Sequence, residues 1–201
     1  GYLEQPNKWG YYHDRIVKPF QRISPRIFCL SDGIRNVYEK ELLIEKSNLY
    51  VTPNGVNTSK FKTRDPKYPD RSLYLAKIDY RKRQSMFQAI DSLYYAGNNA
   101  DPNFNTNINY LGEWSKEHLY NNLTDYGNLV LLSDGEAHPL VCMEALAAGL
   151  GIVVCEYGAA NLDINKDFIT VIPESKITDI KYLEDEIIKN RNYSVSHKDD
   201  I

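Results

Sequence analysis

The chain has 201 residues, 42% of them hydrophobic and 25% charged, which is the balance of an ordinary globular protein with one sizeable core. Its 24 Lys and Arg residues against 27 Asp and Glu residues give a net charge of -3, so no broad basic field is available to hold a nucleic acid backbone. The longest apolar stretch, 139–155, is interrupted by glutamate and glycine and falls short of the roughly 20 apolar residues that a membrane-spanning helix needs.

Short apolar runs rich in β-branched and aromatic residues alternate with segments of helical periodicity. Most of the strand-like runs are apolar throughout, which indicates strands covered on both faces. The pattern predicts an α/β fold, a Rossmann-like parallel sheet with helices on both faces. In chain order, the predicted elements are strand 27–30, helix 34–46, strands 49–52 and 73–76, helix 82–90, strands 93–96 and 108–111, helix 115–123, strand 129–132, helix 139–150, strands 152–155 and 170–172, and helix 182–189.

A domain boundary is predicted between Val56 and Leu73, where Lys, Arg, Asp and Pro residues accumulate. Residues 62–201 contain most of the predicted strands and form the main domain. Residues 1–61 contain few strands, and we interpret them as the remnant of a preceding domain together with an interdomain linker. The N-terminal sequence does not have the pattern of a signal peptide.

The three cysteines, Cys29, Cys142 and Cys155, stand in apolar stretches and form no Cys-x-x-Cys motif. They are interpreted as reduced core residues, which indicates a reducing, cytoplasmic compartment. The sequence has no Cys/His cluster of the kind that holds structural zinc. No metal and no other cofactor is expected.

The most informative stretch, 131–154, combines a strand, a glycine turn and a helix start. The strand ends at Ser133, and Pro139 stands at a position typical of a first helical turn. Open α/β sheets bind ligands at the carboxyl ends of their strands, and a helix N-terminus attracts phosphate. We therefore predict that a phosphate-bearing ligand lies against Gly135, Ala137, His138, Pro139 and Leu140.

Two glutamates flank this helix start. Glu144 stands in an otherwise apolar helix, where an unpaired buried carboxylate is costly, so it must reach water or a partner. Ribose hydroxyls are suitable donors to it, and a solvent-facing stripe of the helix is the alternative position. Glu136 by itself is a loop carboxylate near a helix start, favoured by the helix dipole. His138 is either a donor to a ligand or an incidental loop residue.

A second group of residues lies where strand 73–76 runs into a basic turn. Lys77 and Lys82, five residues apart, could converge on a diphosphate through charge-assisted hydrogen bonds. A solvated basic turn is the alternative interpretation of the same two lysines.

The first of these groups resembles the signature of retaining GT-B glycosyltransferases, the group known as glycosyltransferase family four. The pair Glu136-x7-Glu144 stands in a Gly-Glu-x-x-Pro-Leu-x-x-x-Glu-Ala-x-Ala-x-Gly frame. The resemblance implies that Glu136 is the catalytic residue beside the donor sugar, although not a nucleophile. It also implies that Glu144 holds the ribose of the donor.

The segment 73–84 is similar to the family's Gly-Arg-Leu-x-x-x-Lys-Gly element, whose Arg and Lys bind the donor diphosphate. Lys77 falls at the Arg position and Lys82 at the Lys position, while Ala76 and Arg83 replace the two glycines. A lysine at position 77 lacks the bidentate fork of an arginine. The segment 51–61 is similar to the family's Pro-Asn-Gly-Val-Asp linker between the two domains.

By this resemblance, the chain is the donor-binding C-terminal half of a GT-B enzyme. It would transfer a sugar from a UDP-, GDP- or ADP-sugar, with retention, to an acceptor that the sequence does not identify. The two lysines and the helix start would stabilise the leaving diphosphate. An acceptor-binding N-terminal GT-B domain is expected on the same chain or on another subunit.

Two other interpretations stay open. One is a binding module of the same fold that holds a nucleotide-sugar without transferring it. The other is a different nucleotide-binding α/β protein, against which the lack of a Gly-x-Gly-x-x-Gly or P-loop motif counts.

Overall fold

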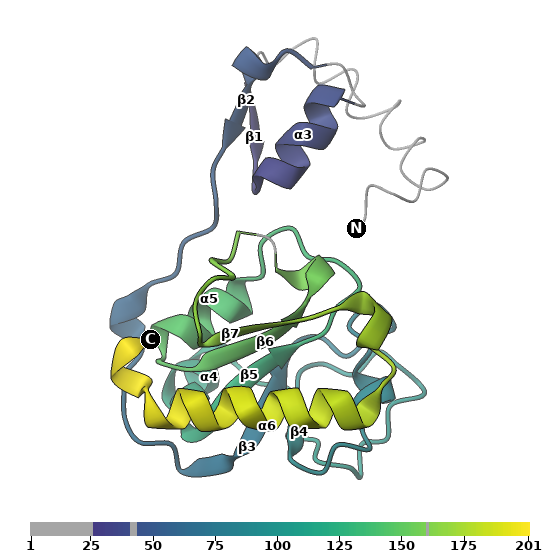
Figure 1. The fold of residues 1–201 in the computed structure, drawn as a ribbon, viewed down its shortest axis with the longest axis vertical. Coiled ribbons are helices and arrows are strands. Elements are labelled where there is room, and N and C mark those ends of the chain that lie inside the picture. The colour runs from purple at the N-terminus through teal and green to yellow at the C-terminus, as the bar shows by residue number, and fades with distance from the viewer. Residues whose placement is uncertain (1–25, 41–43, 160) are drawn as a thin grey trace.

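The structure is a computed structural model, and it describes residues 26–40, 44–159 and 161–201. Two parallel sheets follow one another along the chain (Figure 1). The smaller sheet consists of β1 (Ile27–Cys29) and β2 (Leu49–Val51), joined through helix α3 (Asp32–Lys40). The larger sheet consists of β3 (Tyr68–Leu75), β4 (Leu93–Ala96), β5 (Tyr126–Leu131), β6 (Gly151–Cys155) and β7 (Ile169–Ile172).

The larger sheet has the strand order β4-β3-β5-β6-β7, and every pairing in it is parallel. A single parallel bridge between Tyr95 and Tyr110 adds a further position outside β4. Counted with this bridge, the order is the 3-2-1-4-5-6 arrangement of dinucleotide-binding sheets. The order reverses between β3 and β5, so the carboxyl ends of these two strands form the topological switch point where such sheets bind ligands.

Helices cover both faces of the larger sheet, as its apolar strands predict. One face carries α6 (Ile180–Ser196), whose buried Asn190 and Ser194 bond to β5 and β6, and the other carries α4 (Lys116–Asn122) and α5 (Leu140–Ala147) (Figure 1). The strands β5 and β6 are buried along their whole length. The predicted Rossmann-like α/β fold is therefore confirmed.

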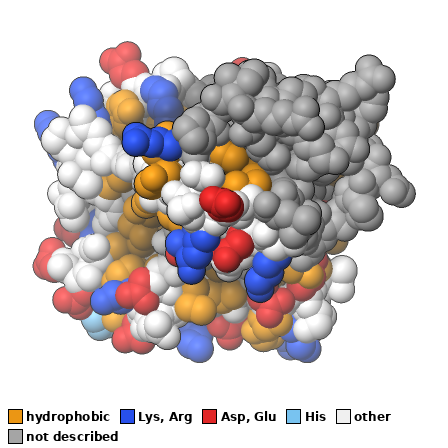
Figure 2. Space-filling model, turned by 90° about the horizontal axis from the view of Figure 1, so that it is seen from above, with side chains coloured by type: hydrophobic (Ala, Val, Ile, Leu, Met, Phe, Trp, Pro, Cys, Tyr) orange, Lys and Arg blue, Asp and Glu red, His pale blue; other side chains and the backbone are white. Residues whose placement is uncertain are grey.

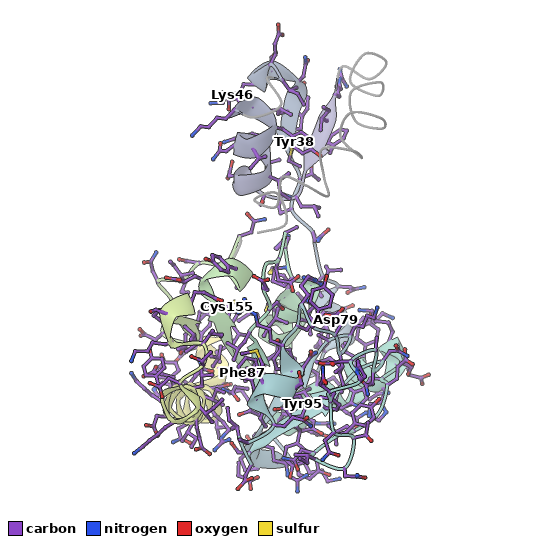
Figure 3. The ribbon with its side chains drawn as sticks, turned by 90° about the vertical axis from the view of Figure 1, so that its right-hand side faces the viewer. Tyr38, Lys46, Asp79, Phe87, Tyr95 and Cys155 are labelled. Carbon is purple, nitrogen blue, oxygen red and sulfur yellow. The ribbon has the colours of Figure 1, made fainter. Side chains whose placement is uncertain are left out.

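Aromatic residues fill the interior beside the switch point. The Tyr74 ring stacks with Phe87 and Tyr95, with ring centroids 6.5 and 6.2 Å apart, and Figure 3 shows Phe87 and Tyr95 inside the larger unit. All three side chains are fully buried. Tyr74 belongs to β3 and Tyr95 to β4. The stack therefore packs these two strands against the segment after β3 that contains Phe87.

Some predicted elements differ from the observed ones. Segment 82–90 is not an α-helix, because Arg83 adopts a left-handed conformation and only the 3-10 helix η5 (Gln84–Phe87) follows it. Strand 108–111 is reduced to the Tyr110 bridge beside Asn109, which also has a positive φ. Helix 34–46 ends at Lys40, and residues 41–43 of that prediction lie outside the described residues.

Within the described residues, no helix is long and apolar enough to cross a membrane. Residues 1–25 of the predicted N-terminal segment lie outside the described residues.

Asn190 is the polar centre of the contact between α6 and the sheet. Its amide nitrogen donates to the carbonyls of Ile152 and Phe168 and to the Thr170 hydroxyl, and its oxygen accepts a 2.9 Å hydrogen bond from the Asn128 side-chain amide. Gly151 permits this close approach, because a Cβ there would lie 3.1 Å from the Asn190 amide oxygen. The helix is therefore fixed to β5, β6 and β7 by one buried carboxamide.

The substitution Asn190→Ala should lower the free energy of unfolding by about 1–3 kcal/mol, because it leaves buried polar partners without hydrogen bonds. Chemical denaturation measures this loss. Asn192→Ala, at an exposed position of the same helix, is the control and should change stability by less than about 0.5 kcal/mol. Equal effects of the two substitutions would contradict the role assigned to Asn190.

Candidate functional site

The candidate site lies where the loops that follow β3 and β5 meet at the switch point. The buried Tyr74 hydroxyl joins them: it donates to the Lys82 carbonyl at 2.6 Å and accepts from the Leu132 amide at 2.9 Å. Burial raises the pKa of Tyr74 well above its ordinary value, so the hydroxyl keeps the proton that it donates. The Asp134 amide adds a 2.8 Å hydrogen bond to the Arg81 carbonyl. These hydrogen bonds fix the loops after β3 and β5 relative to each other.

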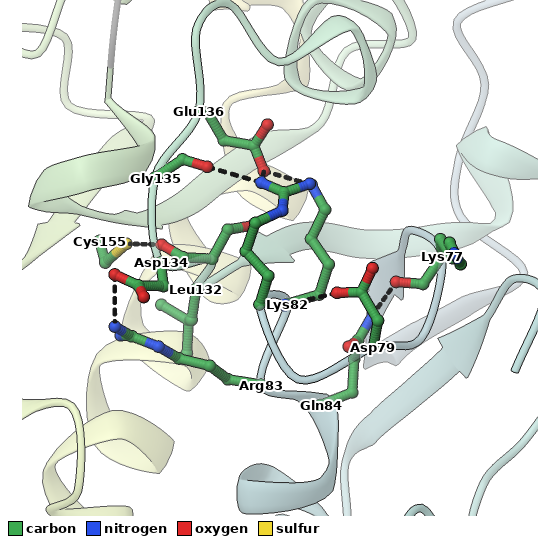
Figure 4. A network of polar contacts seen from close by, with 12 residues as sticks. Lys77, Asp79, Lys82, Arg83, Gln84, Leu132, Asp134, Gly135, Glu136 and Cys155 are labelled. Carbon is green, nitrogen blue, oxygen red and sulfur yellow. Dashed lines mark hydrogen bonds and ion pairs between the residues drawn. The ribbon is translucent and has the colours of Figure 1, made fainter. Parts of the chain in front are cut away.

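The same two loops carry a compact group of charged side chains. The Lys82 ammonium contacts Oε1 of Glu136, and Nη1 of Arg81 lies 3.4 Å from the same oxygen and 2.7 Å from the Gly135 carbonyl (Figure 4). The side chains of Lys82 and Glu136 are only 11% and 12% exposed. Two cations therefore face one carboxylate in a partly desolvated position, where charge interactions are stronger than in water. The surplus positive charge suits an anion.

Lys77 is not part of this group. Its side chain is exposed and lies apart from the Lys82–Glu136 pair in Figure 4, and no ion pair joins it to another described residue. Its carbonyl accepts a hydrogen bond from the buried Gln84 side chain, which fixes the backbone rather than the ammonium group. The second cation next to Lys82 is Arg81, which the sequence interpretation did not single out. Its only sequence signal is its place in the run Arg81-Lys82-Arg83.

The start of α5 lies beside these charges along the chain. The helix begins at Leu140, and its N-cap residue, Pro139, makes no side-chain cap hydrogen bond. The first N–H groups of a helix have no intrahelical acceptor, and they carry the positive end of the helix dipole. Gly135, with a φ of 101°, adopts a conformation that other residues rarely reach, and it turns the loop toward this helix. Ala137 and Leu140 are exposed at the same loop and helix start.

His138 connects this loop to the segment after β2. Its Nδ1 accepts a 2.8 Å hydrogen bond from the Asn54 amide, and the Asn54 side chain donates to the His138 carbonyl at 3.3 Å. Nδ1 therefore carries no proton, and the proton sits on Nε2, which is buried without a partner among the described residues. Burial lowers the pKa of His138. Asn54, in the predicted linker, is thus a partner of the loop that sequence spacing did not reveal.

Glu144 is buried in α5, and its partner is Lys116 at the start of α4, with 2.5 Å between Nζ and Oε1. This contact meets the expectation that the carboxylate must reach water or a partner. The Lys116 side chain is 63% exposed, so solvent screens its ammonium group, whereas the Glu144 carboxylate is covered. Lys116 is a further residue that the sequence interpretation did not single out. Its position directly after Ser115, whose side chain caps α4 as predicted, was the available signal.

The end of the molecule seen from above carries Lys and Arg side chains next to Asp and Glu side chains, with hydrophobic side chains among them (Figure 2). Large apolar side chains are also exposed in the segments that follow the strands: Tyr80 follows β3, Leu140 begins α5 and Tyr157 follows β6. Such a mixture of charge and exposed apolar side chains is typical of a surface that binds a ligand or a partner.

Comparison with known proteins identifies the fold. No family model and no curated protein matches the chain. Solved structures that match include TarM, with a TM-score of 0.67 at 13% identity over 88% of this chain and 39% of that one. WaaG, a glycosyltransferase involved in lipopolysaccharide biosynthesis, matches with a TM-score of 0.62 at 14% identity over 84% of this chain and 58% of that one.

The pneumococcal O-GlcNAc transferase GtfA, solved in complex with UDP and GlcNAc, matches with a TM-score of 0.66 at 16% identity. That match covers 94% of this chain and 44% of GtfA. At these identities the similarity establishes the Rossmann-like α/β fold alone. The chain spans less than two thirds of the length of these proteins.

The lowered pKa of His138 predicts that the stability of the chain depends on pH. The folded-state pKa of this residue lies below the unfolded value of about 6.5, so the unfolded chain binds a proton first as the pH falls. The stability that neutral His138 contributes should therefore be present above about pH 6.5 and be lost below it. Urea denaturation at pH 7.5 and pH 5.5 should show a larger loss of stability in the unsubstituted chain than in His138→Gln. The same loss in both would refute the assignment.

Proposed function

We propose that this chain is the donor-binding part of a retaining GT-B glycosyltransferase and that it binds a nucleotide-sugar at the switch point between β3 and β5. The observation that supports this most strongly is the group of Arg81, Lys82 and Glu136 beside the start of α5. It combines anion-binding groups with a carboxylate at the place where sheets of this order bind nucleotides. The GtfA structure, which contains UDP and GlcNAc, belongs to a protein of the same fold.

In this proposal the diphosphate of the donor lies against Lys82, Arg81 and the first N–H groups of α5. Arg81 supplies the planar fork that a lysine lacks, so it takes the place expected for Lys77. The Lys77 side chain is exposed, so any contact that it makes with the diphosphate is weakened by dissolved salt. As the bond between the anomeric carbon and the phosphate oxygen breaks, negative charge grows on the diphosphate, and these groups stabilise it without rearrangement.

Glu136 is proposed to lie beside the donor sugar. In the structure its carboxylate contacts both cations. In the proposal this contact keeps the two cations oriented toward the diphosphate. A sugar hydroxyl near this carboxylate would find a charged acceptor, a strong kind of hydrogen bond. With retention, the acceptor oxygen attaches on the face of the sugar from which the diphosphate leaves. Glu136 thus orients the sugar and the cations, and it forms no covalent bond.

Glu144 and Lys116 are proposed to form the ribose end of the site. Both ribose hydroxyls of a nucleotide can donate to a carboxylate, and Glu144 is already held at the contact between α5 and α4. We further propose that residues 62–201 form the donor-binding domain, that residues 1–61 belong to a preceding domain and its linker, and that the acceptor is held by an N-terminal domain on this or another chain.

A non-catalytic module that binds the nucleotide-sugar is the alternative. Both functions require donor binding, so turnover separates them. The measurement is release of free sugar from UDP-, GDP- and ADP-sugars, by the chain alone and with a candidate N-terminal domain added. Donor binding without turnover under either condition would favour the module.

The diphosphate contact can be tested by substitution. Arg81→Ala/Lys82→Ala should weaken binding of a nucleoside diphosphate by at least about 100-fold, because two charge-assisted hydrogen bonds are lost. The affinity of the bare nucleoside should stay nearly the same. Lys77→Ala, the matched control in the same loop, should cost less than about threefold. Calorimetry with the three proteins measures these affinities, and an equal loss in Lys77→Ala would place the diphosphate elsewhere.

The ribose contact has its own test. Glu144→Ala should weaken binding of the nucleoside about tenfold or more, because the ribose hydroxyls lose a charged acceptor worth about 1.5–3 kcal/mol. Glu117→Ala removes an exposed carboxylate next to Lys116 on α4 and serves as the control. Circular dichroism should show the same fold in both variants. Unchanged nucleoside affinity in Glu144→Ala would remove the ribose role.

A further inference from the structure

Arg83 is held in a backbone conformation that does not suit it. Its φ of 60° and ψ of 16° place it in the left-handed region, where a side chain is strained and glycine is preferred. Its side chain is nonetheless largely buried, 13% exposed, and directed into the molecule. A strained backbone that carries a buried charge requires compensating contacts.

Two acidic residues supply those contacts. Nη2 of Arg83 lies 3.0 Å from Oδ1 of Asp134, in the loop after β5, and Nη1 lies 2.8 Å from Oε1 of Glu174, after β7 (Figure 4 shows the first pair). Glu174 begins the 3-10 helix η8 (Glu174–Lys176). A single guanidinium therefore joins three loops at the carboxyl edge of the sheet, and neither of its partners lies near it in the sequence.

These contacts close a ring that includes Glu136. The Glu174 amide donates to Oε2 of Glu156 at 2.9 Å, and Glu156 begins the 3-10 helix η7 (Glu156–Gly158). The carbonyl of Tyr157, in the same helix, accepts a 2.9 Å hydrogen bond from the Glu136 amide.

On its other side, the Asp134 amide bonds to the Arg81 carbonyl, and Arg81 and Lys82 hold the Glu136 carboxylate. The loop that carries Glu136 is thus fixed at its backbone and at its side chain by groups whose positions depend on Arg83.

We infer that Arg83 is a positioning residue: it fixes the loop 133–138 so that Glu136, Arg81 and Lys82 keep the geometry that receives the donor. It does not contact the donor itself. The role in donor binding rests on the proposed function, but the fixing of the loop does not. A glycine at position 83 would fit the backbone better and would lose both ion pairs, so the arginine is explained by its contacts and not by the local conformation.

Hydrogen exchange tests the positioning role without any ligand. In Arg83→Gly, the amides of 133–138 should exchange about tenfold faster, because the loop opens locally, while the amides of β5 and β6 keep their rates. Arg64→Gly is the matched control: it removes another arginine that pairs with an aspartate, Asp125, away from this loop. It should leave the exchange of 133–138 unchanged. Unchanged exchange in Arg83→Gly, or faster exchange over the whole chain, would overturn the inference.

Calorimetry with a nucleoside diphosphate then connects the loop to donor binding. If the unsubstituted chain binds, Arg83→Gly should weaken the affinity several-fold, and Arg83→Lys, which can still contact one carboxylate, should recover part of it. Equal affinities in the unsubstituted chain and Arg83→Gly would overturn the role in donor binding. If the unsubstituted chain does not bind any nucleoside diphosphate, the proposed function fails, and the exchange rates alone decide whether Arg83 positions the loop.

Discussion

The geometry of the candidate site depends on one buried hydroxyl. Tyr74 stands at the end of β3 in the fully buried aromatic stack, and its oxygen spans the gap between the Lys82 carbonyl and the Leu132 amide. Packing fixes the ring, and the two hydrogen bonds transfer this rigidity to the loops on both sides of the switch point. Because a lost partner in such a place is costly, the tyrosine specifies one arrangement of these loops. The positions of Arg81, Lys82 and Glu136, which these loops carry, depend on that arrangement.

Burial determines how the charges can be arranged. Glu136, Lys82 and Arg83 are each nearly covered, and a covered charge must have a partner of opposite sign. The carboxylates of Asp134, Glu136 and Glu174 satisfy this requirement from three different loops. The same pairs that remove the cost of burial also hold the loops together. The ion pairs therefore hold the charged groups of the candidate site in place without a bound ligand.

The segment between the two sheets is also coupled to the site. Asn54 bonds both the ring and the backbone of His138, so the loop that leads to α5 is attached to the segment after β2. A further contact, from the Asn161 amide to the Leu30 carbonyl, joins the loop after β6 to the end of β1. These hydrogen bonds attach the segments that follow β1 and β2 to loops of the larger unit.

The fold class and most of the strands and helices could be predicted from the sequence, because wholly apolar strands and capped helices are encoded by neighbouring residues. Helix 82–90 and strand 108–111 could not, because left-handed residues at Arg83 and Asn109 interrupt them. The sequence also placed Glu136, Lys82 and the α5 start in one region, since parallel strands end at the same edge of a sheet. Which charges meet follows from the packing of distant segments and could not be predicted from the sequence. Arg81 and not Lys77 joins Lys82, Lys116 pairs with Glu144, and Asn54 reaches His138. These partners come from distant segments or depend on the left-handed turn at Arg83, and no local pattern encodes such contacts.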